Sequence, residues 1–205
     1  MTRAPKNFPP LRAAFRRAAA LTIVVIVTVV AGWADGGPPV AAAAAASVAQ
    51  REYLIKAAFV FDMLKATQWP KTRSGSVVLC VLGRDPFGAA WGSIAGRPIG
   101  KSKLAVAPVQ AGGNFGACDA LFLSTSERAR WPEIRGALGT RPILTMSEMT
   151  GFAQDGGMVG LMAIDNRLRF DVNLKAVRKA GLNIDTNALK QANMVHAQAA
   201  AVRLP

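Results

Sequence analysis

Four short apolar runs, separated by turns and helical segments, constrain the fold of this 205-residue chain more than any other feature. Ser76–Gly83 is rich in β-branched residues, as is typical of a strand buried on both faces. The other three runs are Leu104–Val109, Ala120–Ser124 and Pro142–Met146. Pro108 weakens one of them as a strand. Helix-start patterns at Thr125–Glu127 and Ser147–Met149 follow the last two runs. Strands that alternate with short helices predict an α/β domain with a mostly parallel central sheet flanked by helices.

Toward the C-terminus the residue pattern changes and predicts antiparallel strands. Met158–Ile164 is apolar throughout, and Arg167–Asn173 alternates between polar and apolar residues. The pair Asp165-Asn166 between them predicts a two-residue turn and therefore a C-terminal antiparallel β-hairpin. The alternation directs these side chains away from the core: Arg167, Arg169, Asp171 and Asn173. Two closing helices are expected at Lys175–Ala180 and Asp185–Ala199.

A strong helical pattern covers residues 50–68 and ends at Trp69-Pro70, because the residue before a proline avoids the helical region. Its apolar positions share helical spacing: Leu54, Ala57, Ala58, Phe61 and Leu64. Glu52 and Lys56 lie four residues apart on the remaining polar side, in the favourable order for an ion pair. The alanine run Ala41–Ala46 has no side chains that could dock, and it is interpreted as a linker.

The N-terminus has the layout of an export signal. Residues 1–17 carry five basic residues and no acidic one, and the apolar run Ala18–Ala34 follows. Two short segments have the small residues that a signal peptidase recognises, and cleavage would follow Ala34 or Ala49. The alternative is an uncleaved anchor of about 17 residues, at the short limit for spanning a bilayer. The body of the protein is exported in both cases. Residues 1–49 are therefore interpreted as signal and linker, and residues 50–205 as one periplasmic domain.

The net charge of +13 raises the question of nucleic-acid binding. Five basic residues precede residue 18, and the others are spread along the chain and form no basic stripe. Export also conflicts with such a partner, so no nucleic acid is expected.

The residue sets of common catalytic and metal sites are missing from the sequence. His196 is the only histidine, and no second ligand lies four residues away. No catalytic residue, metal or cofactor is predicted, which favours a binding protein over an enzyme. In an exported chain, Cys80 and Cys118 are expected to form a disulfide; the alternative is two buried thiols.

The alternative function is a small-ligand receptor or an enzyme. Its pocket would lie at the carboxyl ends of the strands, where open α/β sheets bind ligands. The loops at these ends carry the candidate pocket residues Asp85, Ser124, Thr125 and Ser147. Asp85 is also placed to cap a short helix expected from Phe87 to Ile94.

Several segments resemble the YfiR family. They are the helix Glu52–Phe59 with Trp69-Pro70, the strand and turn Val78–Gly88, the strands Cys118–Ser124 and Pro142–Thr145, and the glycine pair and hairpin between Phe152 and Leu174. The order and spacing of these segments over residues 51–195 carry the resemblance.

The resemblance implies a periplasmic α/β regulator that tends to form a homodimer. It implies repression of a membrane-bound diguanylate cyclase through the periplasmic region of that enzyme, with relief by an outer-membrane lipoprotein. The output would be cyclic-di-GMP signalling and biofilm formation. Cys80 and Cys118 match one family disulfide, whereas a second disulfide of some members has no counterpart because no cysteine follows Cys118.

The outward residues of the predicted hairpin are the candidate partner-binding residues. Arg167, Arg169 and Asp171 would lie at a sheet edge, which a protein must protect, cover or use. Protection of the edge by charge and contact with a partner both fit this pattern. The contact would include the following helix, Leu174–Gly181.

Overall fold

The computed structural model describes residues 40–70, 75–110, 112–165 and 167–196, with side chains from residue 47 onward. These residues belong to one compact unit, Pro38–Pro205. The elements in chain order are α1 (Val40–Ala66), β1 (Thr67–Gln68), β2 (Ser76–Leu82), η1 (Gly88–Ser93), β3 (Pro98–Ile99), β4 (Ser102–Val109), η2 (Phe115–Ala117), β5 (Ala120–Leu123), η3 (Thr125–Arg130), α2 (Trp131–Leu138), β6 (Leu144–Ser147), β7 (Val159–Ile164), β8 (Arg167–Val172), α3 (Leu174–Lys179), β9 (Asn183–Ile184), α4 (Thr186–Leu189) and β10 (Met194–Val195). The predicted signal segment lies outside the described residues.

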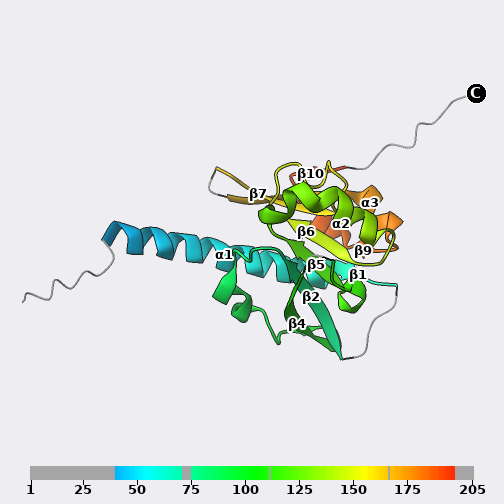
Figure 1. The fold of residues 1–205 in the computed structure, drawn as a ribbon, viewed down its shortest axis with the longest axis horizontal. Coiled ribbons are helices and arrows are strands. Elements are labelled where there is room, and N and C mark those ends of the chain that lie inside the picture. Colours follow the sequence, from blue (N-terminus) through cyan, green and yellow to red (C-terminus); the bar gives the residue numbers. More distant parts are fainter. Residues whose placement is uncertain (1–39, 71–74, 111, 166, 197–205) are drawn as a thin grey trace, which may run out of the picture. The chain divides into compact units, whose positions relative to one another are not determined.

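An eight-stranded sheet forms the centre of the fold, in the order β10-β8-β7-β6-β5-β2-β4-β3 (Figure 1). The strands β4, β2, β5, β6 and β7 run parallel. Ile164 of β7 pairs with Arg167 of β8, so the two-residue hairpin is present, and Asp165 adopts the positive φ that such a turn favours. The predicted α/β class with a mostly parallel sheet is confirmed, and the hairpin is followed by α3, β9, α4 and β10.

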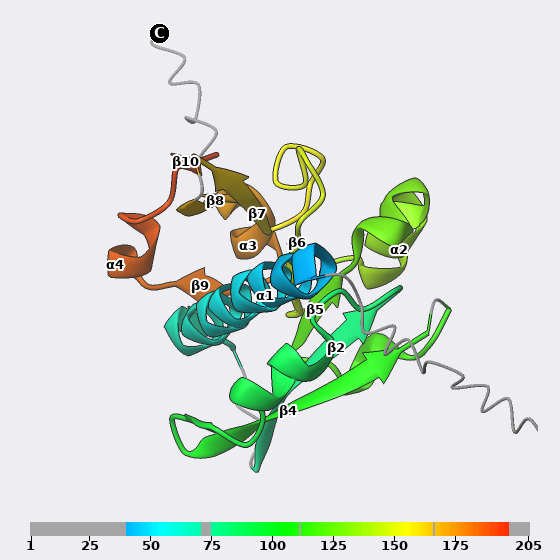
Figure 2. The same ribbon diagram turned by 90° about the vertical axis from the view of Figure 1, so that its left-hand side faces the viewer.

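Helices cover both faces of the sheet. On one face lies α1 (Figure 2), where Val60, Phe61 and Leu64 share a hydrophobic cluster with strand residues including Leu79 and Phe122. On the other face, α2 contributes Trp131, Ile134 and Leu138 to a second cluster. This second cluster contains the predicted disulfide between Cys80 and Cys118, which joins residues 38 apart in the sequence. The two cysteines are thus bonded and not free thiols.

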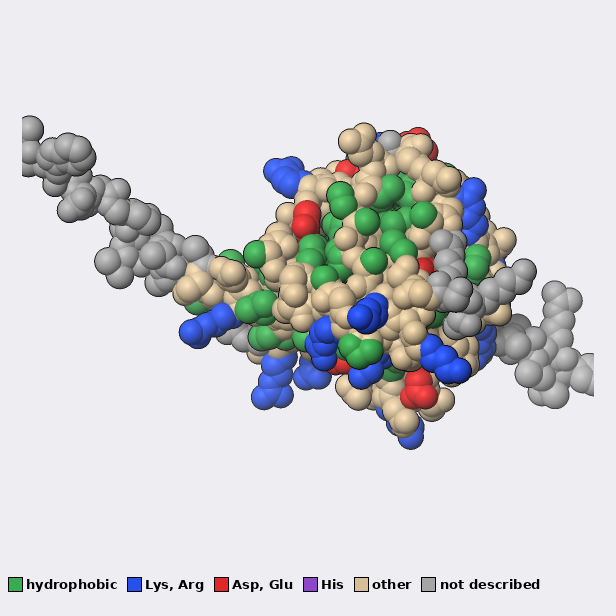
Figure 3. All heavy atoms as spheres, turned by 90° about the horizontal axis from the view of Figure 1, so that it is seen from below, with side chains coloured by type: hydrophobic (Ala, Val, Ile, Leu, Met, Phe, Trp, Pro, Cys, Tyr) green, Lys and Arg blue, Asp and Glu red, His purple; other side chains and the backbone are tan. Residues whose placement is uncertain are grey.

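Pro108 lies in an edge strand, which explains how a proline is accommodated there. β4 pairs with β2 along its whole length, but β3 covers its outer side only at Ser102 and Lys103. Leu104 exchanges hydrogen bonds with Gly96 and Arg97 on that outer side. Pro108, four residues further along the strand, also directs its nitrogen outward, where the missing N–H breaks no ladder bond. β4 lies low in Figure 1, and Figure 3 shows hydrophobic side chains gathered on the face seen from below.

The first helix differs from its prediction at both ends. It begins at Val40 and includes the alanine run interpreted as a linker, because alanine has the highest helix propensity. It ends at Ala66, since the next two residues pair with β9. Leu54 and Ala58 were predicted on the buried stripe but are exposed. They lie on the side of α1 that faces away from the domain, because the intervening Lys56 and Ala57 are buried on the opposite side of the helix.

The helix that follows the third strand is present as η3 and α2, but the helix predicted after the fourth strand and the last closing helix need correction. The Ser147 hydroxyl accepts a hydrogen bond from the Met149 amide, as a cap would, but turns follow instead of a helix, with Gly151 at φ 77°. The predicted helix Asp185–Ala199 is wrong beyond α4. There the chain forms β10, because the Phe170 and Val172 carbonyls at the edge of β8 accept hydrogen bonds from the Asn193 and His196 amides.

Candidate interaction surface

Side chains of α1 fill the region at the carboxyl ends of the parallel strands. Lys56 is only 7% exposed, and its ammonium forms ion pairs with Glu52 (2.5 Å) and with Glu148, the residue after β6. The ammonium lies 4.5 Å from the centre of the Tyr53 ring, and that ring lies 5.0 Å from the ring of Phe87. The predicted Glu52–Lys56 pair is confirmed, but Lys56 is buried and holds α1 against the β6 loop.

The charges of this cluster shift two pKa values. Burial favours the neutral amine of Lys56, but hydrogen bonds from its ammonium to Glu148 and Glu52 outweigh burial and raise its pKa. Burial, followed by the negative charge of Glu148, raises the pKa of Tyr53. Both groups therefore stay protonated to higher pH in the folded protein than in the unfolded chain.

Asp85, the first of the four predicted pocket residues, caps η1. Its carboxylate accepts hydrogen bonds from the Phe87 amide (2.9 Å), the Gly88 amide (3.2 Å) and the Trp91 indole N–H (3.0 Å). The predicted capping role of Asp85 is confirmed. All of these contacts lie within one loop, so the carboxylate is engaged in local structure.

The other three predicted pocket residues lie at the same end of the sheet. The Ser124 hydroxyl accepts a hydrogen bond from the Ser126 amide (3.4 Å) at the start of η3. The fully buried Ser147 hydroxyl donates to the Leu123 carbonyl (2.7 Å). Thr125 is exposed. Ligand binding by these four residues thus remains a prediction, and three of them already serve the protein's own backbone.

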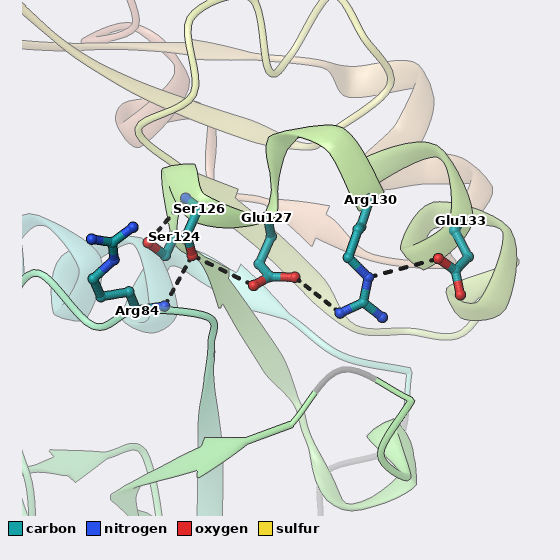
Figure 4. Close-up of polar contacts among 6 residues, drawn as sticks. All are labelled: Arg84, Ser124, Ser126, Glu127, Arg130 and Glu133. Atoms are coloured by element: carbon teal, nitrogen blue, oxygen red, sulfur yellow. Dashed lines mark hydrogen bonds and ion pairs between the residues drawn. The ribbon is translucent and has the colours of Figure 1, made fainter.

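The loops after β2 and β5 are joined by a chain of polar contacts, which Figure 4 shows. The Arg84 amide donates to the Ser126 hydroxyl (3.0 Å), which donates in turn to Glu127 (3.4 Å). Glu127 also pairs with Arg130 (3.5 Å). Gly83 makes this approach possible, because a Cβ there would lie 2.6 Å from the Ser126 hydroxyl oxygen.

The open edge of β8 carries the predicted partner-binding arginines. β10 pairs with β8 only at Asp171 and Val172. In the part of the chain that the structure describes, no strand covers the outer side of Arg167–Arg169. Arg167 and Arg169 are exposed, as predicted, and Ile164 at the end of β7 is 40% exposed. We call Ile164, Arg167 and Arg169 the hairpin surface.

α1 packs against the face of the hairpin opposite the arginines. The Phe59 ring of α1 contacts the Phe170 ring of β8, with 4.7 Å between the ring centres. From this contact, α1 and the hairpin project toward the same side of the domain (Figures 1 and 2). Leu54 and Ile55 of α1 are 40% and 60% exposed. Successive strand residues point to opposite faces, so Arg167 and Arg169 lie on the face of β8 away from α1, whereas Phe170 points toward it.

Asp171, the third predicted partner-binding residue, is not at the surface. It is 4% exposed, because the segment around β10 covers the face toward which it points. Its carboxylate accepts hydrogen bonds from the Gln154 and Asn193 side-chain amides (both 3.3 Å), and His196 Nε2 lies 3.8 Å from it. The alternation of β8 was predicted correctly, but the exposure of Asp171 was wrong.

Comparison with known protein families agrees with this fold. A family described as YfiR/HmsC-like matches residues 53–193. The chain belongs to this family. Its members are periplasmic regulators, and no curated protein matches the chain.

Among the described residues of this YfiR-like domain, no group of three or more histidine, cysteine or acidic residues is placed to hold a metal ion. Likewise, no helix within the described ranges has the length and apolar character needed to cross a membrane.

The partner contact predicted for this YfiR-like domain joined the hairpin arginines to the helix Leu174–Gly181, but the structure places these two parts apart. The hairpin surface lies at the start of β8, whereas α3 follows the end of that strand. Six strand residues span about 20 Å, so the arginines and α3 lie at opposite ends of the sheet. The sequence did not indicate the packing of α1 against the hairpin, because the Phe59–Phe170 contact joins segments far apart in the chain.

Proposed function

We propose that this protein is an exported regulator that represses a membrane-bound diguanylate cyclase by binding the periplasmic region of that enzyme. Membership of the YfiR/HmsC-like family supports this role. Repression would lower cyclic-di-GMP output and biofilm formation, and an outer-membrane lipoprotein would relieve it. The regulator would act by binding, with no catalytic step of its own.

The hairpin surface is the observation that carries the proposal. It combines an open strand edge, two exposed guanidinium groups and an exposed isoleucine. Arginine and large apolar residues are enriched in protein–protein contacts, where an apolar centre is surrounded by a polar rim. The complementary surface of the partner would be acidic, since two arginines must be neutralised when the contact excludes water.

The export proposal rests on the basic and apolar N-terminal residues. Cleavage after Ala34 would leave α1 whole, whereas Ala49 lies inside that helix. The mature protein would act in the periplasm as a homodimer. Sequencing of the N-terminus of the fractionated protein tests this directly, and an intact Met1 in a cytoplasmic fraction would contradict it.

Charge reversal at the hairpin surface tests the regulatory role. We expect Arg167→Glu/Arg169→Glu to fold normally by circular dichroism but to lose repression of cyclic-di-GMP output in the native host. Loss of a desolvated charge pair costs about 2–5 kcal/mol, which weakens binding more than tenfold. The matched control is Lys101→Glu/Lys103→Glu on the exposed β3–β4 turn, which makes the same change in net charge and should still repress. Repression by the hairpin variant equal to that of the wild type would show that the arginines only protect an edge.

A further inference from the structure

A groove of about 610 Å³ lies between α2 and α3, at the amino ends of β6 and β7. Its apolar lining includes Leu138, Ile143 and Met158, all of which are buried. The polar lining includes four basic side chains: Arg135, Arg141, Lys175 and Lys179. No aspartate or glutamate is among the described residues that line it. The volume is that of a small-molecule site.

The positive charge of this groove is local. A second cavity, of about 250 Å³, lies at the opposite ends of β6 and β7 and is lined by Glu148 and Asp171, with no lysine or arginine. The lining of the second cavity thus lacks the basic side chains that the groove has, and Lys56 pairs with its Glu148. The four basic residues are therefore a feature of the groove and not of every cavity in this basic chain.

Arg135 is held in place before any ligand binds. Its Nη1 donates to the Asp155 carbonyl (2.7 Å), and the same carbonyl accepts from the Trp131 indole (3.1 Å). The guanidinium rests against the backbone at Gly156, where a Cβ would lie only 2.4 Å from Nη1. The nitrogens not used by this hydrogen bond remain able to donate to an anion, in the planar arrangement that suits carboxylate and phosphate.

Two more cations come from one face of α3. Lys175 and Lys179 are separated by four residues, so their side chains are neighbours on the helix surface. Arg141 adds a fourth charge from the loop that joins α2 to β6. An anion in the groove would be attracted to these basic side chains, and the apolar lining at Ile143 and Met158 would exclude water behind it.

We propose that the groove between α2 and α3 binds a small organic anion that bears phosphate or carboxylate groups. This site lies about one strand length from the hairpin surface, and the proposal is independent of the identity of the regulated partner. Binding there would make the protein a receptor for a soluble anion as well as a partner of another protein.

Pyrophosphate and citrate are suitable probes for the two kinds of anionic group. We would measure the thermal midpoint of the purified protein against probe concentration, with sodium chloride at equal ionic strength as the reference. The groove variant is Arg141→Gln/Lys179→Gln, and the matched control is Lys101→Gln/Lys103→Gln, which removes the same charge elsewhere. Arg135 is left intact because it supports the loop at Asp155.

We expect at least one probe to raise the wild-type midpoint beyond the salt reference, with an apparent Kd at least tenfold weaker in the groove variant. The control should respond within twofold of the wild type. Equal responses of the two variants, or no response beyond salt, would overturn the proposal. So would co-sedimentation with phosphatidylglycerol vesicles without a response to either soluble anion, because the phosphate recognised would then be a lipid headgroup.

Discussion

The two halves of the eight-stranded sheet are held together by different chemistry. In the half that contains β2, β4 and β5, a disulfide joins Cys80 to Cys118, and Pro108 lies on the outer edge of β4 beyond its last hydrogen bonds. In the half that contains β6, β7, β8 and β10, Lys56 connects α1 to Glu148, and Asp171 connects β8 to the segment around β10. Reduction should therefore loosen the first half, whereas pH and charge substitution should loosen the second.

This difference has a consequence for function. The hairpin surface and the open edge of β8 lie in the half that has no covalent link among its described residues. A region held by non-covalent contacts can open locally without global unfolding. The proposed partner-binding surface would therefore lie where the fold can adjust, with the covalently linked half as the stable support.

Removal of the disulfide has the largest expected effect. For a loop of this length, the chain-entropy model predicts that Cys80→Ser/Cys118→Ser lowers the free energy of unfolding by about 4 kcal/mol. The thermal midpoint should fall by roughly 10 °C. Denaturant titration measures the change, and wild-type protein treated with reductant should match the variant. An unchanged midpoint after complete reduction would show that the two halves do not differ in this way.

Removal of the Lys56 charge should have the next largest effect. Lys56→Met leaves Glu148 without its cation, which should lower the free energy of unfolding by about 2 kcal/mol at pH 7. This loss is smaller than that for a fully buried ion pair, because the other partner, Glu52, is half exposed. The raised pKa of Lys56 stabilises the fold at pH below the ordinary value of 10.5, and this stability is lost as pH rises through the folded-state pKa.

The pH dependence of stability distinguishes the loss of the Lys56 charge from the loss of its packing. We expect wild-type stability to fall above pH 10.5, and the fall should be smaller in Lys56→Met. Tyr53 acts in the same direction, since its raised pKa favours the folded state until the phenol ionises, so some decline should remain in the variant. Lys101→Met provides an exposed control. Parallel stability curves for Lys56→Met and the wild type would contradict the role given to Lys56.

Asp171→Ala should affect only the β10 end of the second half. It leaves the Gln154 and Asn193 amides without their acceptor, at a cost of about 1–2 kcal/mol. Hydrogen exchange should become faster at the Asn193 and His196 amides, which bind the edge of β8. Asp171→Asn keeps one acceptor oxygen and should rescue part of this protection, and Asp62→Ala on the exposed side of α1 should change nothing.

Pro108→Val is expected to have the smallest effect on stability, below about 1 kcal/mol. It adds an outward N–H to β4 and makes this edge able to pair, so sedimentation should show increased self-association. Lys103→Val is the matched control, because it adds the same side chain while its own N–H already binds the Gly75 carbonyl. Equal self-association of the two variants would mean that side chains alone, and not the new donor, cause it.

Much of the fold could be predicted from the sequence because its signals are local. The apolar run at Ser76–Gly83 and the alternation of Arg167–Asn173 each define a strand through neighbouring residues. Asp165 and the residue after it define the hairpin turn in the same way. The alanine run Ala41–Ala46 is helical and not a linker, because high helix propensity requires no docking side chains.

Contacts between distant segments decided the rest, and no local pattern encodes them. The sequence by itself determined the α/β class, the hairpin, the cap formed by Asp85 and the family to which the chain belongs. Only the tertiary structure decided that Lys56 is buried against Glu148, that β10 replaces a helix and covers Asp171, and that basic residues of α2 and α3 line one groove. The physical reason is that burial, charge pairing and strand pairing depend on which segments meet in space, and these segments are separated by up to about a hundred residues in the chain.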